Sequence, residues 1–136
     1  MPIFIDPTTD FGFKKLFGEE KNEGVLKNFL YDILGLSSRI QKITHLPRER
    51  LPQSEDERRG VLDLYCMDED GERFIVEMQN AQQRYFKDRA VYYSMFPIAD
   101  QAKKGKEWQY QLQPVYCLGV LGFSLSEDGA YFSTIR

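Results

Sequence analysis

Residues 61–79 have the sequence VLDLYCMDEDGERFIVEMQ, and this stretch decides the fold. Apolar and polar residues alternate on both sides of an acidic DEDG segment, which is typical of two strands joined by a tight turn. We therefore predict an antiparallel hairpin with strands over residues 61–67 and 72–79. Gly71 stands where a three-residue hairpin loop requires a left-handed backbone.

The loop length fixes which side chains face each other across the hairpin. A three-residue loop places Asp63 directly opposite Glu77, with Cβ atoms about 4.5–5.5 Å apart. A two-residue loop would put the two carboxylates on opposite faces, with one of them in the core. In the predicted register one face is wholly apolar, and it carries Leu62, Leu64, Cys66, Phe74, Val76 and Met78. The other face carries Asp63, Tyr65, Ile75, Glu77 and Gln79.

Two carboxylates opposed across a sheet repel each other, and a divalent cation between them would remove this penalty. Oxygen ligands of this kind suit Mg²⁺ or Mn²⁺, and such an ion can bind a phosphate and acidify water. The alternative is that Asp63 and Glu77 are solvated surface residues, or that Asp63 pairs with an arginine. Spacing alone leaves both interpretations open.

The flanking sequence predicts an α/β domain. Apolar residues recur at helical spacing over residues 8–18, 21–34 and 85–104. A long apolar run (PVYCLGVLGF) indicates a strand buried on both faces. Prolines and charges indicate an exposed loop over residues 47–60. The predicted elements are helices 8–18 and 21–34, strands 39–46, 61–67 and 72–79, helix 85–104, and strand 114–123.

Composition indicates one ordinary globular domain over residues 1–136, with 42% hydrophobic and 29% charged residues. No apolar run is long enough to span a membrane. The two cysteines lie in apolar runs and favour a reducing, cytoplasmic protein. The net charge of −3 is not that of a typical nucleic-acid-binding domain, although basic residues cluster locally. The short polar tail after the last predicted strand suggests an N-terminal fragment of a longer chain.

Several motifs together resemble a known family. V61-L-D63 followed by E77-M-Q79 resembles the PD-(D/E)xK nuclease superfamily, and more closely its Rpn group of recombination-promoting nucleases and transposases. DFGFKKLFG, the leucine-rich second helix, the DG turn, FIVEMQ, RAVYYS and PVYCLGVLGF occur in the family's order. The resemblance implies a restriction-endonuclease-like core, with a central mixed β-sheet flanked by helices in the order α-β-β-β-α-β. The order predicted for this chain, α-α-β-β-β-α-β, matches it when the first two helices are counted together.

By the same resemblance the chain is a Mg²⁺- or Mn²⁺-dependent DNA endonuclease that hydrolyses phosphodiesters with metal-activated water. The family's metal ligands correspond to Asp63, Glu77 and the backbone carbonyl of Met78. Its catalytic lysine corresponds to Gln79, which can form hydrogen bonds but carries no positive charge. Leu62 replaces the proline of the superfamily motif, a position that supplies no chemistry.

Other residues are weaker candidates for contacts with phosphate or with the metal ligands. Arg89 and Tyr93 share a helix face and could contact phosphate or orient Glu77, although tyrosines of such a helix more often pack on the sheet. Asp10 could face the metal or cap the first helix. Arg58 and Arg59 lie in the loop that enters the Asp63 strand and could guide phosphate.

Two functions of different classes therefore remain. The first is a DNA endonuclease connected with recombination or transposition, which the resemblance favours. The second is a catalytically degenerate nuclease fold that binds nucleic acid or a protein partner, which Gln79 and the acidic net charge favour. The sequence leaves open whether two copies act together as a homodimer.

Overall fold

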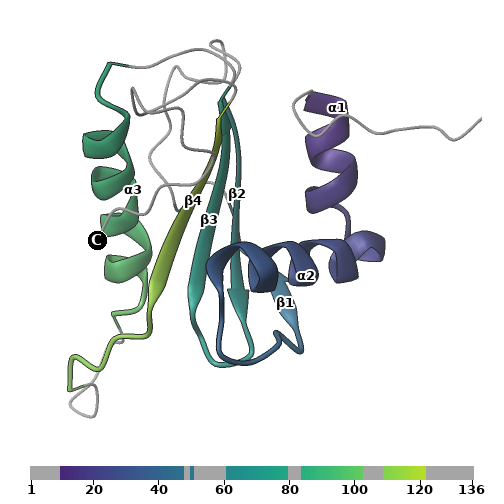
Figure 1. Ribbon diagram of the computed structural model, residues 1–136. Coiled ribbons are helices and arrows are strands. Elements are labelled where there is room, and N and C mark those ends of the chain that lie inside the picture. Colours follow the sequence, from purple (N-terminus) through teal and green to yellow (C-terminus); the bar gives the residue numbers. More distant parts are fainter. Residues whose placement is uncertain (1–9, 48–49, 51–60, 80–83, 103–108, 122–136) are drawn as a thin grey trace, which may run out of the picture.

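The computed structural model describes residues 10–47, 50, 61–79, 84–102 and 109–121 (Figure 1). The elements are α1 (Asp10–Phe13), the π-helix η1 (Lys14–Gly18), the 3₁₀ helix η2 (Glu20–Asn22), α2 (Glu23–Leu34), β1 (Ile43–His45), β2 (Val61–Asp68), β3 (Arg73–Gln79), α3 (Phe86–Asp100) and β4 (Val115–Leu121). A mixed four-stranded sheet has the order β1-β2-β3-β4, antiparallel except for the parallel pair β3 and β4. The predicted α/β class and element order are confirmed.

The predicted hairpin register is confirmed. Asp63 pairs with Glu77, within a ladder that runs without interruption along β2 and β3. Gly71 has a φ of 83°, the left-handed backbone that the turn requires. Asp68 Oδ1 accepts hydrogen bonds from the backbone N–H groups of Asp70 and Glu72, both at 2.9 Å. This side chain thus helps to hold the turn that sets the register.

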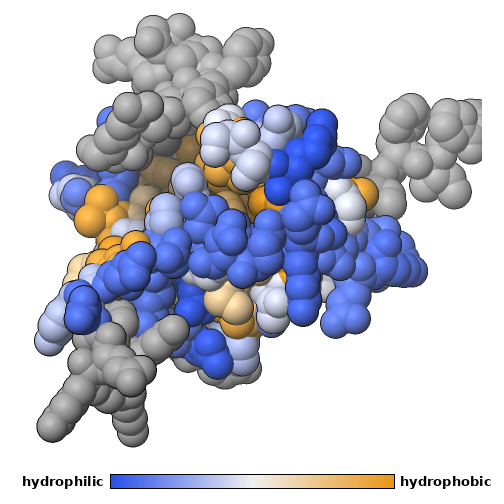
Figure 2. All heavy atoms as spheres, turned by 90° about the horizontal axis from the view of Figure 1, so that it is seen from below, coloured by the Kyte–Doolittle hydropathy of each residue, from blue (hydrophilic) through white to orange (hydrophobic). Residues whose placement is uncertain are grey.

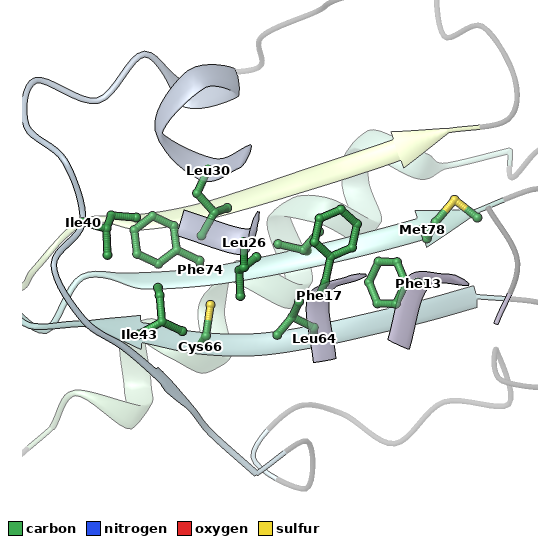
Figure 3. Packing of buried hydrophobic residues seen from close by; sticks show 11 residues of the cluster. Phe13, Phe17, Leu26, Leu30, Ile40, Ile43, Leu64, Cys66, Phe74 and Met78 are labelled. Atoms are coloured by element: carbon green, nitrogen blue, oxygen red, sulfur yellow. The ribbon is translucent and has the colours of Figure 1, made fainter. Parts of the chain in front are cut away.

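Helices cover the sheet on both faces (Figure 1). The segment α1–η1 and α2 lie over one face, and α3 lies over the other. Residues from the hairpin and the first helices point toward one another in the first layer (Figure 3). This main core contains Phe13, Phe17, Leu26, Leu30, Ile40, Ile43, Leu64, Cys66, Phe74, Val76 and Met78. The apolar face predicted for the hairpin is therefore confirmed, except for Leu62, whose side chain is not described.

The second layer, between the sheet and α3, combines apolar and polar contacts. Tyr65 and Ile75 pack against Tyr93. Near the end of α3, Asp100 Oδ2 accepts hydrogen bonds from the Tyr65 hydroxyl at 2.8 Å and from the guanidinium groups of Arg50 and Arg73 at 3.3 and 3.4 Å. These four residues, the Asp100 cluster, fasten the C-terminal end of α3 to the sheet.

The N-terminal end of α3 approaches the sheet at a glycine. A Cβ at Gly119 in β4 would lie 2.7 Å from the tip of the Phe86 ring, closer than two carbon atoms can approach. Phe86 is buried, with 7% of its surface exposed. The absence of a side chain at Gly119 therefore lets the helix begin close against the sheet.

The outer side of α3 is also partly apolar. Figure 2 shows hydrophobic side chains on the side of the molecule where α3 lies, whereas most of the remaining described surface in that view is hydrophilic. The exposed large hydrophobic residues of this helix are Val91, Tyr92, Met95 and Ile98. None of the described helices is long and apolar enough to cross a membrane.

Two elements differ most from their predicted bounds. β1 spans Ile43–His45 rather than residues 39–46, because the backbone N–H groups of Gln41 and Lys42 donate to the Glu69 carboxylate instead of joining the ladder. α3 ends at Asp100 rather than at residue 104, and it continues through Pro97.

The close approach at Gly119 gives a stability prediction. Gly119→Ala should lower the free energy of unfolding by about 1–3 kcal/mol, because the new Cβ overlaps the Phe86 ring and forces a shift in a packed layer. Urea unfolding measures the change. Gly24→Ala is the matched control, since Gly24 lies in α2 with no atom within 4 Å of its Cβ position. Equal effects of the two substitutions would show that the contact with Phe86 is not restrictive.

The turn gives a pH prediction. The pKa of Glu72 is raised from 4.5 to about 7, first by burial and then by its hydrogen bond with Asp68. Between these two pH values the Glu72 carboxyl holds a proton in the folded chain but has released it in the unfolded chain. The free energy of unfolding therefore falls as the pH rises through this range. We expect the free energy of unfolding of wild type to fall relative to that of Glu72→Gln across pH 4.5–7, and the gap to stay constant above.

Glu69→Gln is the control on the same turn. The pKa of Glu69 is lowered, first by a hydrogen bond from its own backbone amide and then by those of Lys42 and Gln41. Its contribution to stability is present at neutral pH and lost as the pH falls, so its pH dependence should have the opposite sign. Chemical denaturation at several pH values measures both differences, and a pH-independent gap for Glu72→Gln would contradict the prediction.

Candidate active site

The central strand β3 places Glu77 and Gln79 on the face that α3 covers. The two residues are two apart, so their side chains lie on the same side of the sheet. Both are fully buried, with 0% of their surface exposed. β3 is paired with β2 on one side and with β4 on the other. A buried acid and a buried amide therefore stand side by side on the most constrained strand of the sheet.

Arg89 of α3 supplies positive charge to this acid. Its Nη2 lies 3.4 Å from Glu77 Oε1, and its guanidinium carbon lies 4.3 Å from the centre of the Tyr93 ring. Arg89 and Tyr93 share one helix face, as the spacing predicted, and Tyr93 packs on the sheet. The interpretation of Glu77 as a solvated surface carboxylate is wrong, because Glu77 forms a buried ion pair.

Gln79 contacts the other oxygen of the same carboxylate. Its Nε2 donates a hydrogen bond to Glu77 Oε2 at 3.2 Å. Its Oε1 is buried and accepts no hydrogen bond from any residue that the structure describes. The Glu77 carboxylate thus receives a charged donor on one oxygen and a neutral donor on the other.

The neighbouring cysteine lies in the same buried layer. Burial first, and the Glu77 carboxylate second, raise the pKa of Cys117 to about 12, while Arg89 acts in the opposite direction. The pKa of Cys66 is also raised to about 12, mainly by burial in the other layer. Both thiols are therefore protonated at neutral pH, and neither is suited to act as a nucleophile.

The remaining predicted site residues are placed by the backbone only or not at all. Asp63 lies opposite Glu77, but its side chain is not described. Met78 turns its side chain into the other core, and its backbone carbonyl as a ligand stays a prediction. Asp10 begins α1, on the face opposite α3, and its side chain is also not described (Figure 1). Arg58 and Arg59 lie outside the described residues.

The contacts that dock α3 were not predicted from the sequence. Phe86 lies against Gly119, and the only signal for this contact was a glycine inside an otherwise apolar strand run. Asp100 gathers Arg50, Tyr65 and Arg73 at the other end of the helix. No pattern in the sequence marks Asp100 as different from any exposed acid at a helix end.

The chemistry of the described donors fits a hard divalent cation. No group of three or more His, Cys, Asp or Glu side chains that could hold a metal occurs among the described residues, a set that excludes the Asp63 carboxylate. Glu77 offers a carboxylate, and the buried Gln79 Oε1 is an oxygen acceptor with no partner among the described residues. Oxygen ligands of these two types are the ones that Mg²⁺ and Mn²⁺ prefer.

The ion pair predicts a strong response to loss of Arg89. Arg89→Met keeps the apolar stem but leaves the buried Glu77 carboxylate without its cation, which should cost about 3–5 kcal/mol of unfolding free energy. Replacing both residues, as Arg89→Met with Glu77→Gln, should recover part of this loss. A double-mutant cycle by chemical denaturation measures the coupling. Additive effects of the two substitutions would contradict a direct interaction.

Comparison with known proteins identifies the family. The family described as PD-(D/E)XK nuclease family transposase matches residues 7–136. No significant match was found among proteins of curated function or among solved structures. The match covers nearly the whole chain, including both strands of the hairpin, α3 and β4. The chain therefore belongs to the PD-(D/E)XK nuclease family of transposases.

Proposed function

We propose that this protein is a Mg²⁺-dependent DNA endonuclease, with Asp63, Glu77 and Gln79 at its active site. The observation that carries the proposal is the buried Glu77 carboxylate, directly opposite Asp63 in the hairpin register. A buried carboxylate is retained at a cost in stability, and such groups cluster at functional sites. Membership of a nuclease family gives the reaction class, and the hairpin gives the residues.

Arg89 and Tyr93 hold the acid in place. The ion pair from Arg89 fixes Glu77 Oε1, and Tyr93 stacks beneath the guanidinium group. We assign both residues a positioning role, because Arg89 pairs with the acid and Tyr93 packs against both Arg89 and the sheet. The burial of this pair also restricts water, which strengthens every electrostatic interaction at Glu77.

Asp63, Glu77 and the backbone carbonyl of Met78 would hold the cation. When bound, Mg²⁺ or Mn²⁺ would supply positive charge to a scissile phosphate and lower the pKa of water beside it. Gln79 stands where the family carries lysine, and an amide neither accepts nor releases a proton at neutral pH. No described side chain beside Glu77 replaces that lysine as a base, so Gln79 would act through its dipole.

Asp63→Asn and Glu77→Gln test the assignment. Each substitution preserves shape but removes one negative charge from the proposed site, so nicking of supercoiled plasmid DNA in Mg²⁺ should fall by at least about 100-fold. Gel electrophoresis with Mg²⁺, Mn²⁺ or EDTA measures cleavage. Glu72→Gln is the matched control, because Glu72 lies in the same hairpin at the turn end. Full activity in both site variants would refute the proposal.

The second function, binding without catalysis, keeps one specific observation in its favour. Gln79 replaces the residue that supplies positive charge in the family pattern. A chain that binds duplex DNA equally in EDTA and in Mg²⁺, and never cuts it, would support this function. A role in recombination or transposition rests on the family alone.

A further inference from the structure

The arrangement of the Gln79 amide leaves one polar atom unsatisfied. Nε2 donates to Glu77 Oε2 at 3.2 Å, while Oε1 is buried without a hydrogen-bond partner among the described residues. A buried acceptor without a donor is costly, because it has given up its hydrogen bonds to water and gained none in the protein. Only the NH2 end of the amide can donate to the carboxylate, so the orientation that satisfies Glu77 leaves Gln79 Oε1 without a donor among the described residues.

A half-turn of the amide exchanges its two ends. The last torsion of a glutamine side chain is broad and roughly two-fold, so the exchange needs no movement of the backbone. It would bring Oε1 to the place that Nε2 occupies, about 3 Å from Glu77 Oε2. Two oxygens at that separation repel each other unless a cation lies against both.

The separation itself matches a metal shell. Neighbouring ligands of an octahedral Mg²⁺ ion, each about 2.0–2.1 Å from the metal, lie about 3 Å apart. The atoms of Gln79 and Glu77 are 3.2 Å apart already. The pair is therefore preorganised to present two oxygens to one hard cation, provided that the amide turns.

We propose that Gln79 is itself a metal ligand through Oε1, and that binding of the cation turns its amide. The inference rests on the proposed metal-dependent function and deepens it, since that function requires of Gln79 only a polar role beside the ligands. A neutral amide oxygen adds a ligand without adding negative charge. The buried charge supplied by Glu77 therefore stays balanced by Arg89 and the cation.

This role also explains what a glutamine contributes at position 79, where the family pattern has a lysine. A lysine there would bring a second cation toward the metal, whereas the glutamine contributes an oxygen to it. The two residues are thus not equivalent in chemistry. Gln79 strengthens the hold on the metal, and the protein gives up a charged group next to the reacting water.

The test is metal binding by the whole chain, measured without any reaction. Mn²⁺ is titrated by calorimetry into metal-free wild type, Gln79→Met and Gln79→Glu, in the presence of uncleavable duplex DNA. Gln79→Met should weaken Mn²⁺ binding by at least about 10-fold, a loss that even outer-shell partners of a metal cause. Gln79→Glu should bind Mn²⁺ at least as tightly as wild type, because it keeps an oxygen at that place.

A second readout counts water directly. Mn²⁺ electron paramagnetic resonance in ¹⁷O-enriched water reports how many water molecules coordinate the ion, and Gln79→Met should carry one more than wild type. Thermal unfolding checks that each variant is folded. Gln101→Met is the matched control, since Gln101 is a buried glutamine at the opposite end of α3 and should leave Mn²⁺ affinity unchanged.

The outcomes separate this inference from the function on which it rests. If Mn²⁺ binds wild type and Glu77→Gln abolishes binding, but Gln79→Met changes neither affinity nor water count, Gln79 is not a ligand while the proposed function stands. If wild type binds no Mn²⁺ even with DNA, the proposed function and the inference both fail.

Discussion

The buried carboxylate of Glu77 is the constraint on which the rest of the structure depends. An ionised acid excluded from water is costly unless it is paired and hydrogen-bonded, and Glu77 receives both kinds of support from Arg89 and Gln79. Arg89 can reach it only because α3 lies close to the sheet. That approach requires Gly119 under Phe86 at one end of the helix.

The two faces of the sheet divide the work between packing and chemistry. The layer under α1 and α2 is a continuous apolar core of eleven buried hydrophobic residues. It stabilises the hairpin from one side, mostly through burial of aliphatic and aromatic surface. The layer under α3 combines fewer apolar contacts with two ionic groupings, one at Glu77 and one at Asp100. Strong packing on one face thus compensates for polar burial on the other.

The parts of the structure that follow from local rules were predictable from sequence. Gly71 and the acidic turn set the register, and period-two alternation then determined which hairpin residues enter which layer. Gly35 ends α2 in the left-handed conformation expected of a stop signal. Each of these outcomes depends on residues that are close together in the chain.

The docking of α3 could not be predicted in the same way. The pattern gave Arg89 and Tyr93 a common face but not the partner of that face, because helix–sheet contacts depend on residues far apart in sequence. The grouping at Asp100 joins Arg50, Tyr65 and Arg73 from three separate segments. A solvated Glu77 was one interpretation of its hairpin face, and the complete burial of Glu77 and Gln79 was visible only once α3 was in place.

The parallel pairing of β3 with β4 has a consequence for the order of folding. The hairpin closes through a short turn, whereas the segment that connects β3 to β4 contains the whole of α3. Short loops close before long ones, so Asp63 and Glu77 meet while the Arg89 side of the sheet is still bare. Water must screen the two acids until the helix arrives. We therefore expect the ion pair to form after the hairpin, so that the acids of an isolated hairpin lack the counter-charge of Arg89.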